Sequence, residues 1–161
     1  MNRKEQLIAE FEALIPFVES LRKYGEGRLT SPIGEGKWSL KDMLSHFMLW
    51  DRYYIERALE PIAERKDEAV IAVSNQFEIE SYNQQAIAFA EGRTASDVMD
   101  LMIETRQRVL YLLEQIPEDL YDKSYSDLDG DPFNIAEYVT DMTGHDGHHL
   151  AQMKDYILTA D

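Results

Sequence analysis

Apolar side chains recur every three or four residues along almost the entire chain, a spacing that places them on one face of an α-helix. The pattern predicts helices over about 3–24, 40–61, 76–91, 95–116 and 134–158. No segment shows the sustained alternation of apolar and polar residues that is typical of a β-strand. A chain patterned in this way is restricted to helical architectures, because its apolar faces must be buried against one another.

Local signals mark the ends of several predicted helices. Pro16 is expected to kink the first helix or to remove one of its hydrogen bonds, and Gly25 and Gly27 are expected to end it. Ser39 with Asp42 resembles a capping box at the start of the second helix, with aspartate in place of the usual glutamate. These signals agree with the boundaries that the periodicity predicts.

The remaining segments are less regular. The second helix is expected to stop near Pro61, segment 61–75 has no clear pattern, and Phe77 stands near the start of the third helix. Segment 119–132 is polar and rich in turn residues. Four long helices with one short helical insert predict an all-α, up-down helical bundle formed by a single domain, residues 1–161.

Composition and charge exclude several classes of function. The 161 residues suit one domain, and 44% are hydrophobic, so the chain can bury a full core. The formal net charge of −15 and the isolated basic pairs disfavour nucleic acids and anionic membranes as partners. No apolar run approaches the ~20 residues of a membrane span, and the first residues do not resemble a signal peptide. We therefore expect a cytoplasmic protein with a small-molecule substrate.

Three histidines in two separated segments carry the main functional signal. His145 and His149 are four residues apart in the last predicted helix, so both imidazoles project from one face. His46 stands about a hundred residues upstream, in the second predicted helix, and could supply a third ligand. Helical histidine pairs at this spacing commonly hold a divalent metal, and three neutral ligands leave coordination positions open for catalysis.

The histidines border the apolar faces of their helices, which leaves two interpretations open. Inward imidazoles either bind a metal or satisfy hydrogen bonds within the core. His148 points about 100° away from His149 around the helix. It could replace His149 as a ligand, donate a hydrogen bond to a ligand, or carry protons.

Other polar and aromatic residues near the histidines are candidates for supporting roles. Those that could orient the ligands through hydrogen bonds are Asp146, Gln152, His148, Asp51 and Tyr54. Those that could line a pocket are Trp50, Tyr53 and Tyr138. An aspartate beside a ligand is equally well explained as a solvated helix charge, and aromatic residues at helical spacing are common in ordinary cores.

Two segments together resemble the DinB-like (YfiT-like) superfamily of metalloenzymes. Residues 38–46, WSLKDMLSH, are similar to the family's Trp-Ser segment, which leads a helix into a metal-binding histidine. Residues 145–152, HDGHHLAQ, are similar to its C-terminal His-x-x-x-His helix with a trailing glutamine. The resemblance spans nearly the whole chain. It implies His46, His145 and His149 as metal ligands, and a four-helix bundle with a long crossover that is often dimeric.

The resemblance also implies a range of activities. Characterised members include thiol S-transferases that use bacillithiol, mycothiol or glutathione, a mycothiol-dependent isomerase, and resistance proteins that act on electrophilic toxins. The family name implies no DNA binding, which agrees with the acidic composition. This chain lacks obvious paired arginines that would hold an anionic thiol, so the resemblance does not specify the thiol.

The leading hypothesis is a divalent-metal enzyme, with zinc or nickel as the most suitable ion. It would join a low-molecular-weight thiol to an electrophilic small molecule, or act as a related hydrolase if the metal activates water. The chain contains no cysteine, so the thiol must be a cosubstrate. One alternative is a bundle that binds or sequesters a small molecule or toxin without catalysis. The other is a metal-free bundle. A homodimer is expected from the family.

Overall fold

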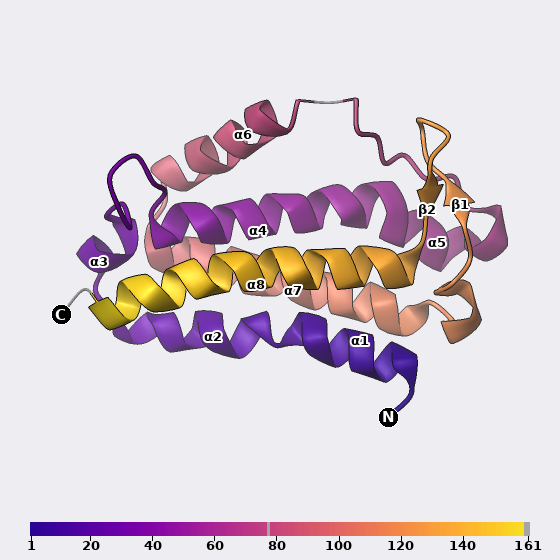
Figure 1. Ribbon diagram of the computed structural model, residues 1–161, viewed down its shortest axis with the longest axis horizontal. Coiled ribbons are helices and arrows are strands. Elements are labelled where there is room, and N and C mark those ends of the chain that lie inside the picture. The colour runs from indigo at the N-terminus through magenta and orange to yellow at the C-terminus, as the bar shows by residue number, and fades with distance from the viewer. Residues whose placement is uncertain (77, 160–161) are drawn as a thin grey trace.

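The computed structural model describes residues 1–76 and 78–159 and consists almost entirely of helices (Figure 1). Four rods form a bundle: α1 (Arg3–Glu12) continued by α2 (Leu14–Ser20), α4 (Leu40–Tyr54), α7 (Ala95–Gln115) and α8 (Ile135–Thr159). The crossover from α4 to α7 contains α6 (Ile79–Glu91), which packs against the outer side of α4. This crossover returns the chain to the end where α4 begins, so α4 and α7 run in the same direction. The expected four-helix bundle with a long crossover is confirmed.

Short elements join the rods. They are the 3-10 turns Leu21–Lys23, Lys66–Glu68 and Glu118–Leu120, helix α3 (Glu26–Thr30), the π turn Ile55–Leu59 and helix α5 (Glu60–Arg65). Strand β1 (Tyr125–Ser126) pairs antiparallel with β2 (Pro132–Phe133), with Tyr125 opposite Phe133. Strands of two residues are too short to show alternation, so the sequence pattern indicates only the turn between them.

The first rod is interrupted at Ala13, three residues before Pro16. A proline ring clashes with the carbonyl four residues earlier, here that of Glu12, so the interruption falls ahead of the proline. The expected interruption is therefore present. The expected end of this helix at the two glycines is only partly right, because Gly25 precedes α3 and Gly27 lies inside it.

The expectation that the second helix stops near Pro61 is wrong. The helix widens into the π turn Ile55–Leu59 and continues as α5 to Arg65. Proline has no N–H for the carbonyl of Arg57, and the N–H of Ala72 donates to that carbonyl at 2.8 Å instead. A backbone group from the crossover thus replaces the missing donor and lets the helix continue through the proline.

The third helix begins at Ile79 and not at residue 76, and Phe77 lies outside the described residues. The capping box before α4 is present: the N–H of Asp42 donates to Ser39 Oγ at 3.0 Å, and the N–H of Ser39 donates back to Asp42 Oδ2 at 3.2 Å. Within the described ranges, no helix is long and apolar enough to cross a membrane.

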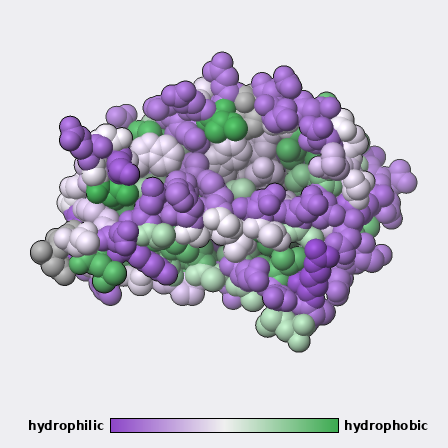
Figure 2. Space-filling view, in the orientation of Figure 1, coloured by the Kyte–Doolittle hydropathy of each residue, from purple (hydrophilic) through white to green (hydrophobic). Residues whose placement is uncertain are grey.

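The core consists of two apolar clusters separated by a layer of buried charge. One cluster includes Phe11, Ile55, Val109 and Val139, and the other includes Leu14, Phe47, Met102 and Met153. The layer between them contains Arg106 and Asp51, both 0% exposed, and Asp146, which is 4% exposed. On the face seen in Figure 2, hydrophilic side chains dominate, and residues of apolar and intermediate character gather in the strip between α6 and α8.

Candidate metal centre

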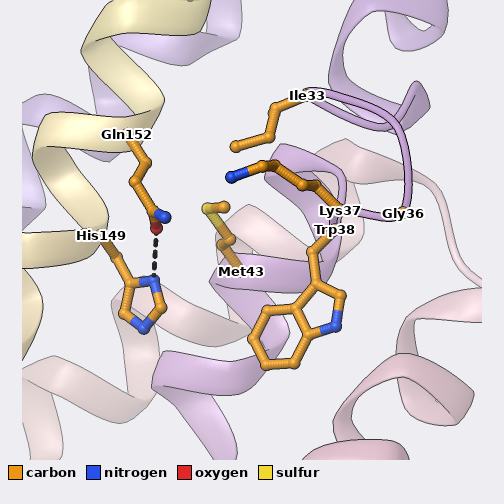
Figure 3. Close-up of a pocket in the computed structure, with 7 residues that line it drawn as sticks. All are labelled: Ile33, Gly36, Lys37, Trp38, Met43, His149 and Gln152. Carbon is orange, nitrogen blue, oxygen red and sulfur yellow. Dashed lines mark hydrogen bonds between the residues drawn. The ribbon is translucent and has the colours of Figure 1, made fainter.

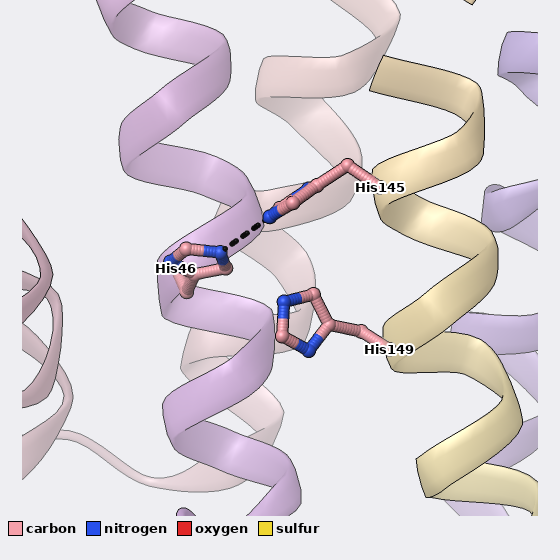
Figure 4. Close-up of side chains that lie close together, drawn as sticks. All are labelled: His46, His145 and His149. Atoms are coloured by element: carbon pink, nitrogen blue, oxygen red, sulfur yellow. Dashed lines mark hydrogen bonds between the residues drawn. The ribbon is translucent and has the colours of Figure 1, made fainter. Parts of the chain in front are cut away.

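Three histidines from α4 and α8 converge inside the bundle. One ring nitrogen from each of His46, His145 and His149 lies within 4.8 Å of the other two, and the Nε2 atoms of His46 and His145 are 3.1 Å apart. Figure 4 shows the three rings facing one another between the two helices. The fold therefore brings together the three histidines that the sequence pattern singles out.

A contact from the crossover helix determines the protonation of His46. The indole Nε1–H of Trp50 is a donor only, and it donates to Asn83 Oδ1 at 2.9 Å. Asn83 must therefore present its oxygen here, and His46 Nδ1, 3.1 Å away, donates to the same oxygen. A proton on Nδ1 leaves the lone pair of Nε2 directed at the other two histidines.

Gln152 holds His149 in an equivalent way. It follows His149 by three residues on α8, and its Oε1 accepts a hydrogen bond from His149 Nδ1 at 3.1 Å. The Nε2 atom of His149 is therefore unprotonated as well. The expected role of Gln152, which is to orient a ligand, requires this contact.

His145 lies beside a buried carboxyl group. Arg106 donates to Asp146 Oδ2 at 2.9 Å, and the other oxygen, Oδ1, is 3.8 Å from His145 Nδ1. Among the described residues neither Oδ1 nor Nδ1 has a hydrogen-bond partner. Unpaired buried polar atoms cost free energy. A proton on His145 Nδ1 would satisfy both atoms after a small rotation and would leave Nε2 of His145 free.

Arg106 ties this carboxyl group to the whole bundle. Its guanidinium donates to Asp51 at 2.8 and 3.2 Å and to the carbonyl of Phe11 at 3.0 Å, so it contacts every rod. Although burial lowers the pKa of Arg106, attraction to Asp51 and Asp146 raises it above its ordinary value, and the group stays charged. One guanidinium faces two carboxyl groups, and burial raises the pKa of Asp51 although the attraction of Arg106 opposes this rise.

Two of the three imidazoles have lowered pKa values. Burial, together with the neighbouring imidazoles of His145 and His149, lowers the pKa of His46 from 6.5 to about 3. Burial and His145 also lower the pKa of His149. Both rings are neutral at pH 7, which is the state in which histidine binds a metal.

The donor set fits a divalent transition metal. Two nitrogens bound to one zinc ion at about 2.1 Å each lie about 3.0–3.4 Å apart. The distance of 3.1 Å between the Nε2 atoms of His46 and His145 falls in this range. Two lone pairs at that distance repel unless a cation or a proton lies between them. Three imidazoles without thiolates suit zinc, nickel, iron or copper.

The other candidates from the sequence lie around the histidine group. His148 is exposed, and its ring centroid is 5.5 Å from that of His149. Trp50 contacts His46 with ring centroids 6.5 Å apart. His148 is therefore outside the converging group, while Trp50 contacts His46 directly.

The tyrosines have different surroundings. The hydroxyl of Tyr53 donates to the carbonyl of Ser74 at 3.1 Å. Tyr54 and Tyr138 pack with ring centroids 4.5 Å apart and line a pocket of about 140 Å³ that includes none of the three histidines. Burial raises the pKa of Tyr54 to about 12. These residues form an aromatic cluster, and Tyr138 lines a pocket other than the one beside the histidines.

A second pocket, of about 270 Å³, opens beside His149 (Figure 3). It lies between the loop before α4, the first turn of α4, and α8, and is lined by Ile33, Lys37, Trp38, Met43, His149 and Gln152. The Trp38 ring is nearly parallel to that of His149, with centroids 6.3 Å apart, and lies 5.0 Å from the ring of His46. This is the pocket that adjoins the histidine group.

The residues of the site that sequence reasoning missed include Asn83, Arg106 and Lys37. Arg106 had a usable signal, because it follows Met102 by four residues and precedes Val109 by three, which places a charge within an apolar stripe. Asn83 had none, because its partner His46 is 37 residues away and belongs to a different helix.

Solved structures share this fold. YfiT from Bacillus subtilis, described as a probable metal-dependent hydrolase with an unusual four-helix bundle topology, aligns with a TM-score of 0.71 at 14% identity, over 95% of this chain and 85% of YfiT. An uncharacterized protein from Clostridium difficile 630 aligns at 0.69 and 13% identity, over 97% and 92%. A mycothiol-dependent maleylpyruvate isomerase aligns at 0.68 and 13%, over 92% of this chain and 60% of its own. At such identities the likeness shows the fold alone.

The fold and the histidine group define a four-helix bundle that carries a cluster of possible metal ligands between two of its rods. The family model of the DinB superfamily matches residues 6–153, and the chain therefore belongs to the DinB superfamily. No curated protein matches the chain at a significant level. The resemblance seen in the sequence is confirmed for the family and the fold.

Proposed function

We propose that this protein is an enzyme that depends on a divalent metal held by His46, His145 and His149, with zinc or nickel as the expected ion. The proposal depends above all on the convergence of the three imidazoles. Amide oxygens hold the protons of two of them away from the shared centre. Three neutral protein ligands leave coordination positions open, as in catalytic rather than structural sites.

The proposed reaction joins a low-molecular-weight thiol to an electrophilic small molecule. When bound, a divalent ion supplies a Lewis acid that lowers the pKa of a neighbouring thiol or water toward neutrality. The thiol sulfur forms a bond to the electrophilic carbon, the leaving group departs with the bonding electrons, and the thiol proton passes to water. Because the chain has no cysteine, the thiol is a cosubstrate. The mycothiol dependence of one structural neighbour supports this class of cosubstrate.

The chain's own residues hold the ligands in place. Asn83 and Gln152 keep a proton on Nδ1 of their histidines, so these imidazoles act as fixed ligands and not as acid–base groups. Arg106 holds Asp146 beside the third histidine. Trp38 covers one side of the group with an apolar ring, which excludes water there.

Hydrolysis is the second candidate, because the same arrangement can activate water, and YfiT is described as a probable metal-dependent hydrolase. A bundle that binds or sequesters a small molecule or toxin without catalysis would use the same pocket. Turnover separates both enzymatic candidates from this binding role.

Elemental analysis of protein purified without chelator tests the metal. We expect roughly one divalent ion per chain in the wild type, as in a mononuclear site, and none in His145→Ala/His149→Ala. His148→Ala is the matched control, because this imidazole is exposed, and it should keep the metal. Full occupancy in the double variant would contradict the site. A wild type that takes up neither zinc nor nickel would favour the metal-free bundle.

Turnover by the metal-loaded protein tests the reaction. Chloride release from a chlorodinitrobenzene that requires both the metal and an added thiol would support the transferase. Cleavage of a nitrophenyl ester without thiol would support the hydrolase. Ligand binding with neither activity would support the sequestering role.

We further propose a cytoplasmic homodimer without nucleic acid among its partners, as the resemblance and the net charge of −15 indicate. Sedimentation velocity at micromolar concentration should give twice the chain mass of 18.7 kDa. A species of single-chain mass at that concentration would contradict the dimer.

A further inference from the structure

The pocket beside His149 combines a cation, an amide donor and apolar walls. Lys37, Gln152 and Met43 point into it from three different segments (Figure 3). Its volume of about 270 Å³ is just below the range of about 300–1,000 Å³ for ligand pockets, so it suits a small molecule. None of the described residues that line it is acidic, although the whole chain has a net charge of −15.

The local backbone places Lys37 at this pocket. Its N–H donates to the carbonyl of Gly34 at 3.0 Å, closing a tight turn in which Gly36 has φ 70°, a conformation that favours glycine. The N–H of Ile33 donates to the carbonyl of Trp38 at 3.0 Å, which ties the base of the turn. The stem of Lys37 lies over Gly34, where an added Cβ would be 3.2 Å from Cδ. Within the described residues the Lys37 ammonium has no carboxylate in ion-pair distance.

Gln152 supplies a second donor to the same space. Its Oε1 is occupied by His149 Nδ1, so its Nε2 is left to bond an acceptor on a ligand. Trp38 presents a flat ring and Met43 a thioether along the walls. These features select a ligand with an anionic, acceptor-rich end and an apolar body.

We infer that this pocket binds a small organic acid, with the carboxylate held by Lys37 and Gln152 and the apolar body between Trp38 and Met43. The role of that acid as a substrate or as the thiol cosubstrate rests on the proposed metal-dependent function. The binding of the acid to the pocket does not rest on that function, because none of the four residues that hold the acid is a proposed ligand of the metal.

Titration with phenylpropionate tests the inference, with its uncharged amide as the matched probe. The full-length chain is stripped of metal, so that the carboxylate cannot bind to an ion. NMR resonances of the Trp38 indole and the Gln152 side-chain amide report binding at the site. We expect the acid to bind about tenfold more tightly than the amide, the effect of one charge-assisted contact.

Variants at two lysines, Lys37 and Lys23, separate the pocket from the overall charge. Lys37→Met keeps the length of the side chain and should weaken binding of the acid about tenfold without affecting the amide, while Lys37→Arg should retain binding. Lys23→Met removes the same charge outside the pocket and should leave binding unchanged. An equal loss in both methionine variants, equal binding of acid and amide, or no shift at Trp38 with millimolar acid would each overturn the inference.

A titration with mercaptopropionate distinguishes the two possible sources of the acid. Tighter binding than butyrate, which has a methyl group in place of the thiol, assigns the pocket to the thiol, equal or weaker binding assigns it to the second substrate, and both results support a carboxylate site. Lys37-dependent binding in a protein that takes up no metal would refute the proposed function and leave this inference standing. Metal uptake without acid binding would refute only this inference.

Discussion

Among the individual side chains, Asn83 connects the crossover helix to the histidine group. Its Oδ1 accepts from both Trp50 and His46, and so keeps the proton of His46 on Nδ1. Replacing Asn83 by leucine removes this acceptor and allows the proton to move to Nε2, where it competes with a metal. We expect zinc binding to weaken about 10–100-fold, measured by competition with a chromogenic chelator.

Two further variants serve as controls for that result. Asn83→Asp keeps an acceptor and should retain the affinity, whereas Gln84→Ala changes an exposed neighbour on the same helix and should have no effect. If the leucine variant bound zinc as tightly as the wild type, the contact would have no part in orienting His46.

His46 also makes the stability of the metal-free protein depend on pH. Its pKa is about 3 in the fold against 6.5 in the unfolded chain, so between these values the unfolded chain binds a proton that the fold does not. The free energy of unfolding should therefore be highest well above pH 6.5 and decrease as the pH falls, by about 1.5 kcal/mol between pH 6.5 and 5. Urea unfolding across this range measures it. His46→Gln should reduce the slope, with the remainder due to His149, whose pKa is also lowered by burial, and a variant with unchanged slope would contradict the assignment.

At the scale of the elements, the four rods meet at Arg106. Its guanidinium bonds to α4 through Asp51, to α8 through Asp146 and to α1 through the carbonyl of Phe11. Arg106→Met leaves two buried carboxyl groups without a cation, and we expect a loss of about 3–5 kcal/mol in the free energy of unfolding by urea.

Removing the carboxyl groups as well provides the control for the Arg106 variant. A triple variant with Arg106→Met, Asp51→Asn and Asp146→Asn has no unpaired charge in the layer and should recover part of the lost stability. A single variant as stable as the wild type would show that the layer does not hold the rods together.

For the whole molecule, metal binding and folding should be linked. The unfolded chain lacks the site, because the proposed ligands come from α4 and α8. An ion that binds only the fold stabilises it by about 2.7 kcal/mol at a hundredfold excess over its dissociation constant. Zinc or nickel should raise the thermal midpoint of the wild type, and chelation should reverse the rise. The same rise in His145→Ala/His149→Ala would mean that the ion binds elsewhere.

Much of the architecture could be predicted because it depends on local spacing. Each rod buries one face, so periodicity alone indicates where it lies, and the four-residue interval places His145 and His149 on the same side of α8. The continuation of the helix through Pro61 could not be predicted. The N–H of Ala72 that satisfies the carbonyl of Arg57 comes from the crossover, beyond the reach of any local pattern.

Local patterns along the chain predict the helical class and the pairing of His145 and His149 on one helix face, because both depend on residues close together, and two short motifs far apart indicate the family. The packing of the rods, by contrast, brings His46 to that pair, places Asn83 against His46, and sets Arg106 between two buried carboxyl groups. These contacts join residues of different helices, and their energies depend on burial and charge that exist only after the rods have packed.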